Sequence, residues 1–254
     1  MTRKLLLCFI TLMAAALPAM GIPGANLQAQ VDSMAAGETS GIDVTAAFVE
    51  DSLDSFWKIT SPEGSMASFI VELSSSPLLN EFGIYDATEP ENMVTVFSGD
   101  AGAGARALIA ISSSGDVTVT PREGSQVSAS FGGNAFGLFL KYGDHTWYSD
   151  SAKNEGEDHF YAYDVSDMTL APALDWVERN DFTDKDYLFA WEESALGGDD
   201  DDFTDMVLMM ESVEDFTDTV LMTQTVDPQP LPEAGMTLCM LGIALMALHR
   251  VRRA

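Results

Sequence analysis

The densest group of side chains that could do chemistry is an acidic segment at residues 191–205, which reads WEESALGGDDDDFTD. Its four consecutive aspartates repel one another, and a hard cation placed among them would stabilise their ionised form. Ca²⁺ takes roughly six to eight oxygen ligands, which suits clustered carboxylates together with backbone carbonyl groups. The sequence therefore predicts a calcium site, with the expected ligands Glu192, Glu193, Asp200, Asp202 and Asp205.

The spacing of these acids does not fit an EF-hand loop. Counted from Asp200, the sixth position is Asp205, where an EF-hand requires glycine. The flanking residues also read as strands and not as helices. A solvated acidic loop without a fixed ion is the alternative to the calcium site.

A second polar and acidic region lies in another expected loop. Its candidate secondary metal ligands are Asp150, Asn154 and Asp158. We expect this region either to complete the same site or to be surface only.

The elements that must position these loops are short apolar runs separated by Gly, Ser, Asp and Pro. Such a pattern favours an all-β domain, an antiparallel β-sandwich of jelly-roll-like type, because parallel sheets need crossover helices for which there is no room. We place this domain at residues 61–226, after a flexible lead-in at 30–60. One short helix is expected at 171–179. The expected strands are 44–49, 67–73, 81–85, 93–97, 107–111, 117–120, 135–142, 159–163, 187–191 and 206–210.

The N-terminal 29 residues have the features of a secretory signal peptide. Arg3 and Lys4 precede an apolar run from Leu5 to Leu17 that contains one polar residue, Thr11, and small residues follow. The run is too short for a typical membrane span. We expect export, with cleavage somewhere from Ala19 to Ala29.

The C-terminal residues 227–254 combine a short motif, an apolar stretch and an arginine cluster. Leu231, Pro232 and Glu233 precede an apolar segment at 234–248, which could hold the chain in a membrane with the arginines cytoplasmic. This order resembles the PEP-CTERM sorting signal of Gram-negative bacteria, although Ala234 stands where that signal has its second proline. The resemblance implies transient anchoring in the inner membrane and processing by an exosortase-type enzyme. An ordinary tail anchor is the alternative.

Several segments in order resemble the domain of unknown function of family 4114, which is common in PEP-CTERM proteins. The resemblance covers roughly residues 80–212, and its most specific part is the Phe-Ala-Trp-Glu-Glu string with the Gly-Gly and Asp-x-Asp-Phe-x-Asp that follow. It implies an exported β-rich domain with a calcium site at the acids named above, and it carries no assigned activity. The other matching segments are 82–86, 136–140, 148–150 and 154–159.

Composition narrows the remaining function classes. The 254 residues carry a formal net charge of −28, from 12 Lys and Arg against 40 Asp and Glu, so a phosphate-binding basic face is not available and nucleic acid is not an expected partner. Both cysteines, Cys8 and Cys239, lie in the end segments, so the exported region has no disulfide to rely on.

No sequence motif of a metalloprotease, a serine hydrolase or a nucleotide-binding enzyme is present, and we expect the protein not to be an enzyme. The favoured function is that of a structural or binding protein of the cell surface or extracellular matrix, with exopolysaccharide as a possible partner. One alternative is a lectin-like module that uses Trp147 or Trp57 as stacking platforms, although a core role suits each tryptophan. A glycan-acting hydrolase is the weaker alternative.

Overall fold

The structure, a computed structural model, describes residues 23–71, 73, 80–174, 185–196 and 201–216. The chain divides into two compact units, residues 1–217 and 218–254, and the second lies wholly outside the described residues. The apolar start of the signal peptide and the whole sorting motif, Leu231, Pro232 and Glu233, therefore lie outside them too. In the part of the chain that the structure describes, no helix is long and apolar enough to cross a membrane.

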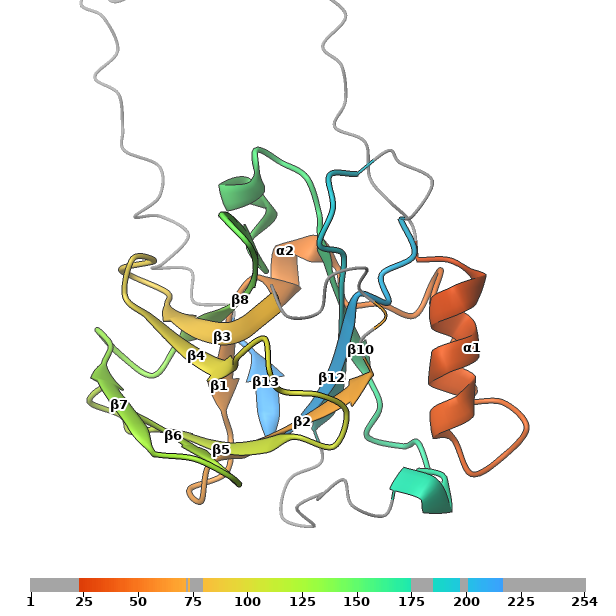
Figure 1. The fold of residues 1–254 in the computed structure, drawn as a ribbon, viewed down its shortest axis with the longest axis horizontal. Helices are drawn as coiled ribbons and strands as arrows, with labels where there is room; N and C mark the ends of the chain where they lie inside the picture. The colour runs from red at the N-terminus through yellow and green to blue at the C-terminus, as the bar shows by residue number, and fades with distance from the viewer. Residues whose placement is uncertain (1–22, 72, 74–79, 175–184, 197–200, 217–254) are drawn as a thin grey trace, which may run out of the picture. The chain divides into compact units, whose positions relative to one another are not determined.

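Two antiparallel sheets make up the first unit (Figure 1), which confirms the expected β-rich fold. The first sheet has the order β13-β1-β8-β3-β4, and β9 also pairs with β8. Its strands are β1 (Trp57–Ile59), β3 (Asn80–Asp86), β4 (Met93–Phe97), β8 (Phe136–Tyr142), β9 (His145–Tyr148) and β13 (Val213–Asp215). The second sheet has the order β10-β11-β12-β2-β5-β6-β7. Its strands are β2 (Ser65–Val71), β5 (Arg106–Ile111), β6 (Asp116–Pro121), β7 (Val127–Ser130), β10 (Phe160–Asp164), β11 (Asp186–Trp191) and β12 (Met206–Glu211).

The main core is formed by alternate residues of facing strands, as the two-residue period of a strand requires. Ile84 of β3 and Leu138 of β8 belong to the same buried cluster as Phe189 of β11 and Leu208 of β12. All four side chains are fully buried. Because the cluster takes residues from both sheets, it holds the two sheets together by apolar burial.

A second apolar cluster lies under helix α1 (Ala25–Met34), where the sequence had suggested the end of a signal peptide and a flexible lead-in. Leu27, Val31 and Met34 point into this cluster, which also contains Tyr163 and Met209 of the second sheet. The lead-in prediction overlooked this helical spacing of apolar residues. A cut at Ala29, within the expected cleavage range, would remove Leu27 from the cluster.

The lead-in segment also contains α2 (Asp51–Asp54) and β1, so residues 30–60 are largely part of the domain. The strand expected at 44–49 is wrong, because this segment is a turn with a single bridge from Phe48 to Tyr163. The other expected strands are confirmed, with ends that differ by two residues at most.

Four strands were missed: β1, β7, β9 and β13. Each has only three or four residues, too few for a clear alternation. Of the helix expected at 171–179, the structure shows a single turn, η3 (Pro172–Leu174), and residues 175–179 lie outside the described part.

Two reciprocal glycine–aromatic pairs fix the register between β3 and β8. Gly83 lies opposite Phe139, and Tyr85 lies opposite Gly137. A Cβ atom at Gly137 would overlap the ring of Tyr85, which is itself fully buried. Each aromatic ring therefore occupies the space that a side chain on the opposing strand would need, so a shift of register would produce a clash.

Replacement of Gly137 by Ala should lower the free energy of unfolding by about 2–3 kcal/mol, because the Tyr85 ring must move to make room for the new methyl group. Urea unfolding followed by tryptophan fluorescence measures this. Gly133→Ala is the matched control, since its Cβ meets nothing within 4 Å, and it should change stability by less than about 0.5 kcal/mol. Equal effects of the two substitutions would contradict the packing argument.

Candidate functional site

The acidic loop begins and ends at neighbouring strand ends. β11 and β12 are antiparallel partners, and Trp191 at the end of β11 lies opposite Met206 at the start of β12. Glu192 and Glu193 follow the first strand, and Asp205 directly precedes the second. This pairing brings three of the five expected metal ligands to one place.

These three carboxyl groups are buried, at 1% exposure for Glu192, 6% for Glu193 and 8% for Asp205. The backbone N–H of Glu193 donates to Oδ2 of Asp205 at 2.8 Å. Burial, followed by a side-chain hydrogen bond to Glu192, raises the pKa of Asp205 well above its usual value. The hydrogen bond to Glu192 therefore favours the protonated form of Asp205.

Both glutamate side chains accept hydrogen bonds from other residues. Oε1 of Glu192 accepts from the N–H and the hydroxyl of Ser194, at 3.1 and 2.6 Å. Oε2 of Glu193 accepts from the amide of Asn80 at 2.7 Å. Asn80 begins β3, so Glu193 connects the acidic loop to the first sheet.

Asp202 has a different position, because it faces helix α1. Its Oδ2 accepts from the side-chain amide of Asn26 at 2.8 Å, and its Oδ1 accepts from the N–H and hydroxyl of Thr204 at 3.0 and 2.6 Å. Asp200 lies outside the described residues. Within the ranges that the structure describes, no three acidic, histidine or cysteine side chains stand close enough to form a ready metal-binding group.

Phe203 explains how the loop separates these groups. Its φ of 56° is in the left-handed region, which is rare for a bulky residue and marks a backbone held by its surroundings. The side chain is fully buried in the second apolar cluster, with its ring 4.8 Å from that of Tyr161. Phe203 lies between Asp202 and Asp205 in the sequence, and its ring turns into the core. The two aspartates therefore bond to different parts of the chain, Asp202 to Asn26 and Asp205 to Glu193.

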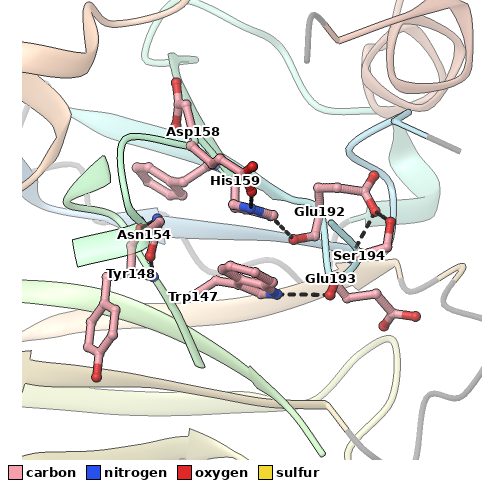
Figure 2. A network of polar contacts seen from close by, with 10 residues as sticks. Trp147, Tyr148, Asn154, Asp158, His159, Glu192, Glu193 and Ser194 are labelled. Atoms are coloured by element: carbon pink, nitrogen blue, oxygen red, sulfur yellow. Dashed lines mark hydrogen bonds and ion pairs between the residues drawn. The ribbon is translucent and has the colours of Figure 1, made fainter. Parts of the chain in front are cut away.

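A buried histidine and a tryptophan form the wall beside the glutamates (Figure 2). His159 is fully buried, and its ring stacks on Trp147 with centroids 3.7 Å apart. Nε1 of Trp147 donates to the carbonyl of Glu193 at 2.8 Å, and Nδ1 of His159 lies 3.1 Å from the carbonyl of Glu192. The two rings thus hold the backbone of both glutamates. The sequence had placed His159 in the second polar region, at the start of the expected strand 159–163, but nothing in it indicated the stacking on Trp147.

The two tryptophans that were candidates for sugar stacking both pack against other aromatic side chains of the protein. Trp57 is fully buried in the main core against Tyr187 and Phe189. The expectation that it is a platform for sugar stacking is therefore wrong, because its side chain points from β1 into the core. Trp147 is half-buried, and His159 covers one of its faces. The ring of His145 lies nearly parallel to Trp147 at 6.0 Å.

Of the three candidate secondary ligands, Asn154 and Asp150 bond to neighbouring residues, whereas Asp158 is a buried acid. Asn154 uses both ends of its amide on the backbone of Tyr148, at 2.9 and 2.8 Å. Asp150 caps the 3₁₀ turn η2 (Ser151–Asn154) and pairs with Lys153 at 3.0 Å. Asp158 is 4% exposed and, in Figure 2, points away from Glu192 and Glu193. Burial and the charge of Asp51 raise the pKa of Asp158 to about 7.

A separate cavity of about 690 Å³ lies between the loop that follows β4 and the strands β6 and β7. Arg106 and Arg122 both line it, together with the ring of Phe97. Two arginines in one cavity are notable in a chain with only 12 basic residues. Asp100 and Glu123 line the cavity as well, so it holds groups of both charges.

Comparison with known proteins does not identify a family. No family model, no curated protein and no solved structure matches the chain. The resemblances to the PEP-CTERM sorting signal and to the domain of family 4114 stay predictions.

The raised pKa of Asp205 predicts how stability depends on pH. Folding keeps Asp205 protonated, whereas the unfolded chain ionises it near pH 4, so without a cation its contribution to stability falls as pH rises from about 4 through neutrality. Asp205→Asn mimics the protonated form and should flatten this fall. Melting temperatures in EDTA between pH 5 and pH 8 measure it.

Asp116→Asn is the control, because Asp116 is exposed and bonds only to neighbouring serines. Its pH profile should match that of the unaltered protein. Burial also raises the pKa of Asp54 and of Asp158. Because these two residues contribute equally to all three profiles, only the difference between profiles reports on Asp205. Parallel profiles for Asp205→Asn and the unaltered protein would contradict the assignment.

Proposed function

We propose that the protein is an exported, non-enzymatic protein of the cell surface or extracellular matrix, in which Ca²⁺ orders the acidic loop. The observation that carries the proposal is the buried pair of Glu192 and Asp205, in which burial and the hydrogen bond to Glu192 raise the pKa of Asp205. A divalent cation can replace the proton of Asp205 and neutralise both carboxylates. Exported proteins meet calcium outside the cell, where the cation would bind the loop.

The first ligands in this proposal are Glu192 and Asp205, at the paired ends of β11 and β12. Glu193, whose carboxylate accepts from Asn80, would add a third carboxylate by turning toward them, while Trp147 and His159 hold the backbone of the two glutamates. Asp202 and Asp200 would supply oxygens from the loop itself. Binding at two strand ends would stabilise the second sheet, because the cation binds the folded chain and not the unfolded one.

The cellular part of the proposal depends on the ends of the chain. A signal-like start, the Leu231-Pro232-Glu233 motif, the apolar segment and the final arginines support export and sorting by an exosortase-type enzyme. An exopolysaccharide is the partner that this location suggests. The jelly-roll-like arrangement belongs to the same proposal, supported by the repeated passage of the chain between the two sheets.

Calcium should raise the melting temperature of the purified protein. At 100 times its dissociation constant the cation adds about 2.7 kcal/mol, which corresponds to roughly 5–10 °C in a domain of this size. A melt in EDTA, followed by one in millimolar CaCl₂, measures the shift. Asp202→Asn combined with Asp205→Asn should remove most of it, whereas Asp116→Asn should leave it unchanged. A full shift in the double variant would overturn the loop as the site.

A lectin-like function is the second candidate, and the cavity at Arg106 and Arg122 is the observation that favours it. Arginine pairs well with carboxylates, so we propose a polysaccharide with acidic groups that bind at the two arginines, in a lining that also contains Asp100 and Glu123. Retention on alginate beads, but not on neutral dextran beads, measures this function. Arg122→Ala should abolish retention. Lys58→Ala should not, because Lys58 is half-exposed and pairs with Glu214 outside the cavity. Equal retention of both variants would exclude the cavity.

A further inference from the structure

Helix α1 belongs to the folded domain from its first residue onward (Figure 1). The carbonyl of Gly24, the residue directly before the helix, accepts from the N–H of Gln28 at 3.1 Å. Pro23, one residue earlier, is buried as well. The domain therefore includes the chain from Pro23 onward, and a cut within the helix would remove part of a packed structure.

The first residues of α1 make contacts that a cut inside the helix would remove. Leu27 is fully buried in the second apolar cluster. Gln28 uses both ends of its side-chain amide on the backbone of the segment that follows the helix, at 2.8 and 3.1 Å. The amide of Asn26 donates to Asp202 at 2.8 Å. Cleavage at Ala29 would separate all three residues from the domain.

The part of the expected cleavage range that precedes the domain contains a suitable processing triplet. Signal peptides end in a short motif of the Ala-x-Ala type, in which the two outer residues are small. Ala19, Met20 and Gly21 have this pattern, and Pro18 separates them from the apolar run. The bond after the triplet joins Gly21 to Ile22, directly before Pro23.

The same small-residue rule excludes the other positions in the range. Each remaining small residue is preceded, two positions earlier, by a larger or cyclic residue. These pairs are Leu17 with Ala19, Ile22 with Gly24, Pro23 with Ala25, and Leu27 with Ala29. The burial of α1 and the spacing of small residues are independent observations, and both place the cut before the helix.

We propose that a signal peptidase hydrolyses the peptide bond between Gly21 and Ile22. This inference rests on the proposed export of the protein. Water is the second reactant, so the released residues 1–21 end in a new carboxyl group at Gly21 and the exported chain begins with a new amino group at Ile22. All of α1 stays with the domain, and its contacts to the acidic loop and to the second apolar cluster are kept.

The test identifies the first residue of the exported protein. The full chain is produced in a Gram-negative host, and the exported protein is analysed by N-terminal sequencing and by intact mass. The first residue should be Ile22. Gly21→Phe places a bulky side chain directly before the bond and should abolish the product that begins at Ile22.

Ala29→Phe is the matched control. It introduces the same side chain at the far end of the expected range, on an exposed position of α1. Because Ala29 lies beyond the proposed bond, this variant should still begin at Ile22. Cleavage at Ala29 would give the opposite result, with Gln30 as the first residue and with the block caused by Ala29→Phe.

The outcomes separate this inference from the proposal of export. An exported protein that begins at any residue other than Ile22 would overturn the assigned bond and leave export standing. A product that begins at Ile22 in the Gly21→Phe variant would overturn the role of the triplet. A chain that keeps residues 1–21 and stays inside the cell would overturn both the bond and the proposed export.

Discussion

The cost of burying carboxylates at the ends of β-strands is the constraint on which this structure depends. β11 and β12 are buried along their whole length. The residues directly after β11 and directly before β12 are therefore also in the protein interior. In most domains such positions are taken by apolar or neutral residues. Here they are Glu192, Glu193 and Asp205, and the surroundings supply a set of donors to hold them.

Those donors come from distant parts of the chain, which makes the acidic loop a junction. Asn80 reaches Glu193 from the first sheet, and Asn26 reaches Asp202 from α1. His159, directly before β10, and Trp147 of β9 contact the glutamate backbone. Both sheets and the helix over the second apolar cluster therefore meet at one acidic loop. Neutralising its charge affects all of them at once.

Much of the fold was visible in the sequence, because β11 and β12 read as apolar runs with turns at their ends. The acids at Glu192, Glu193 and Asp205 could be placed together from the same reasoning. The helix at Leu27 and Val31 could not be separated from the signal peptide, since both are apolar and helical, and only tertiary packing distinguishes them. Asp54 was hidden for a different reason. Its burial depends on the packing of α2 against β10 and η2, which no local pattern records.

The strand order also determines when the domain can form. β2 lies between β12 and β5, and β1 pairs with β13. The strands within residues 57–71 can therefore pair fully only after residues 206–215 have been made. The bond between Asn26 and Asp202 closes a separation of 176 residues. Long-range pairing of this kind slows folding, because the loop must close before its contacts repay the lost entropy. A chain that emerges from its N-terminus, at a ribosome or across a membrane, therefore cannot complete either sheet until nearly the whole domain has appeared.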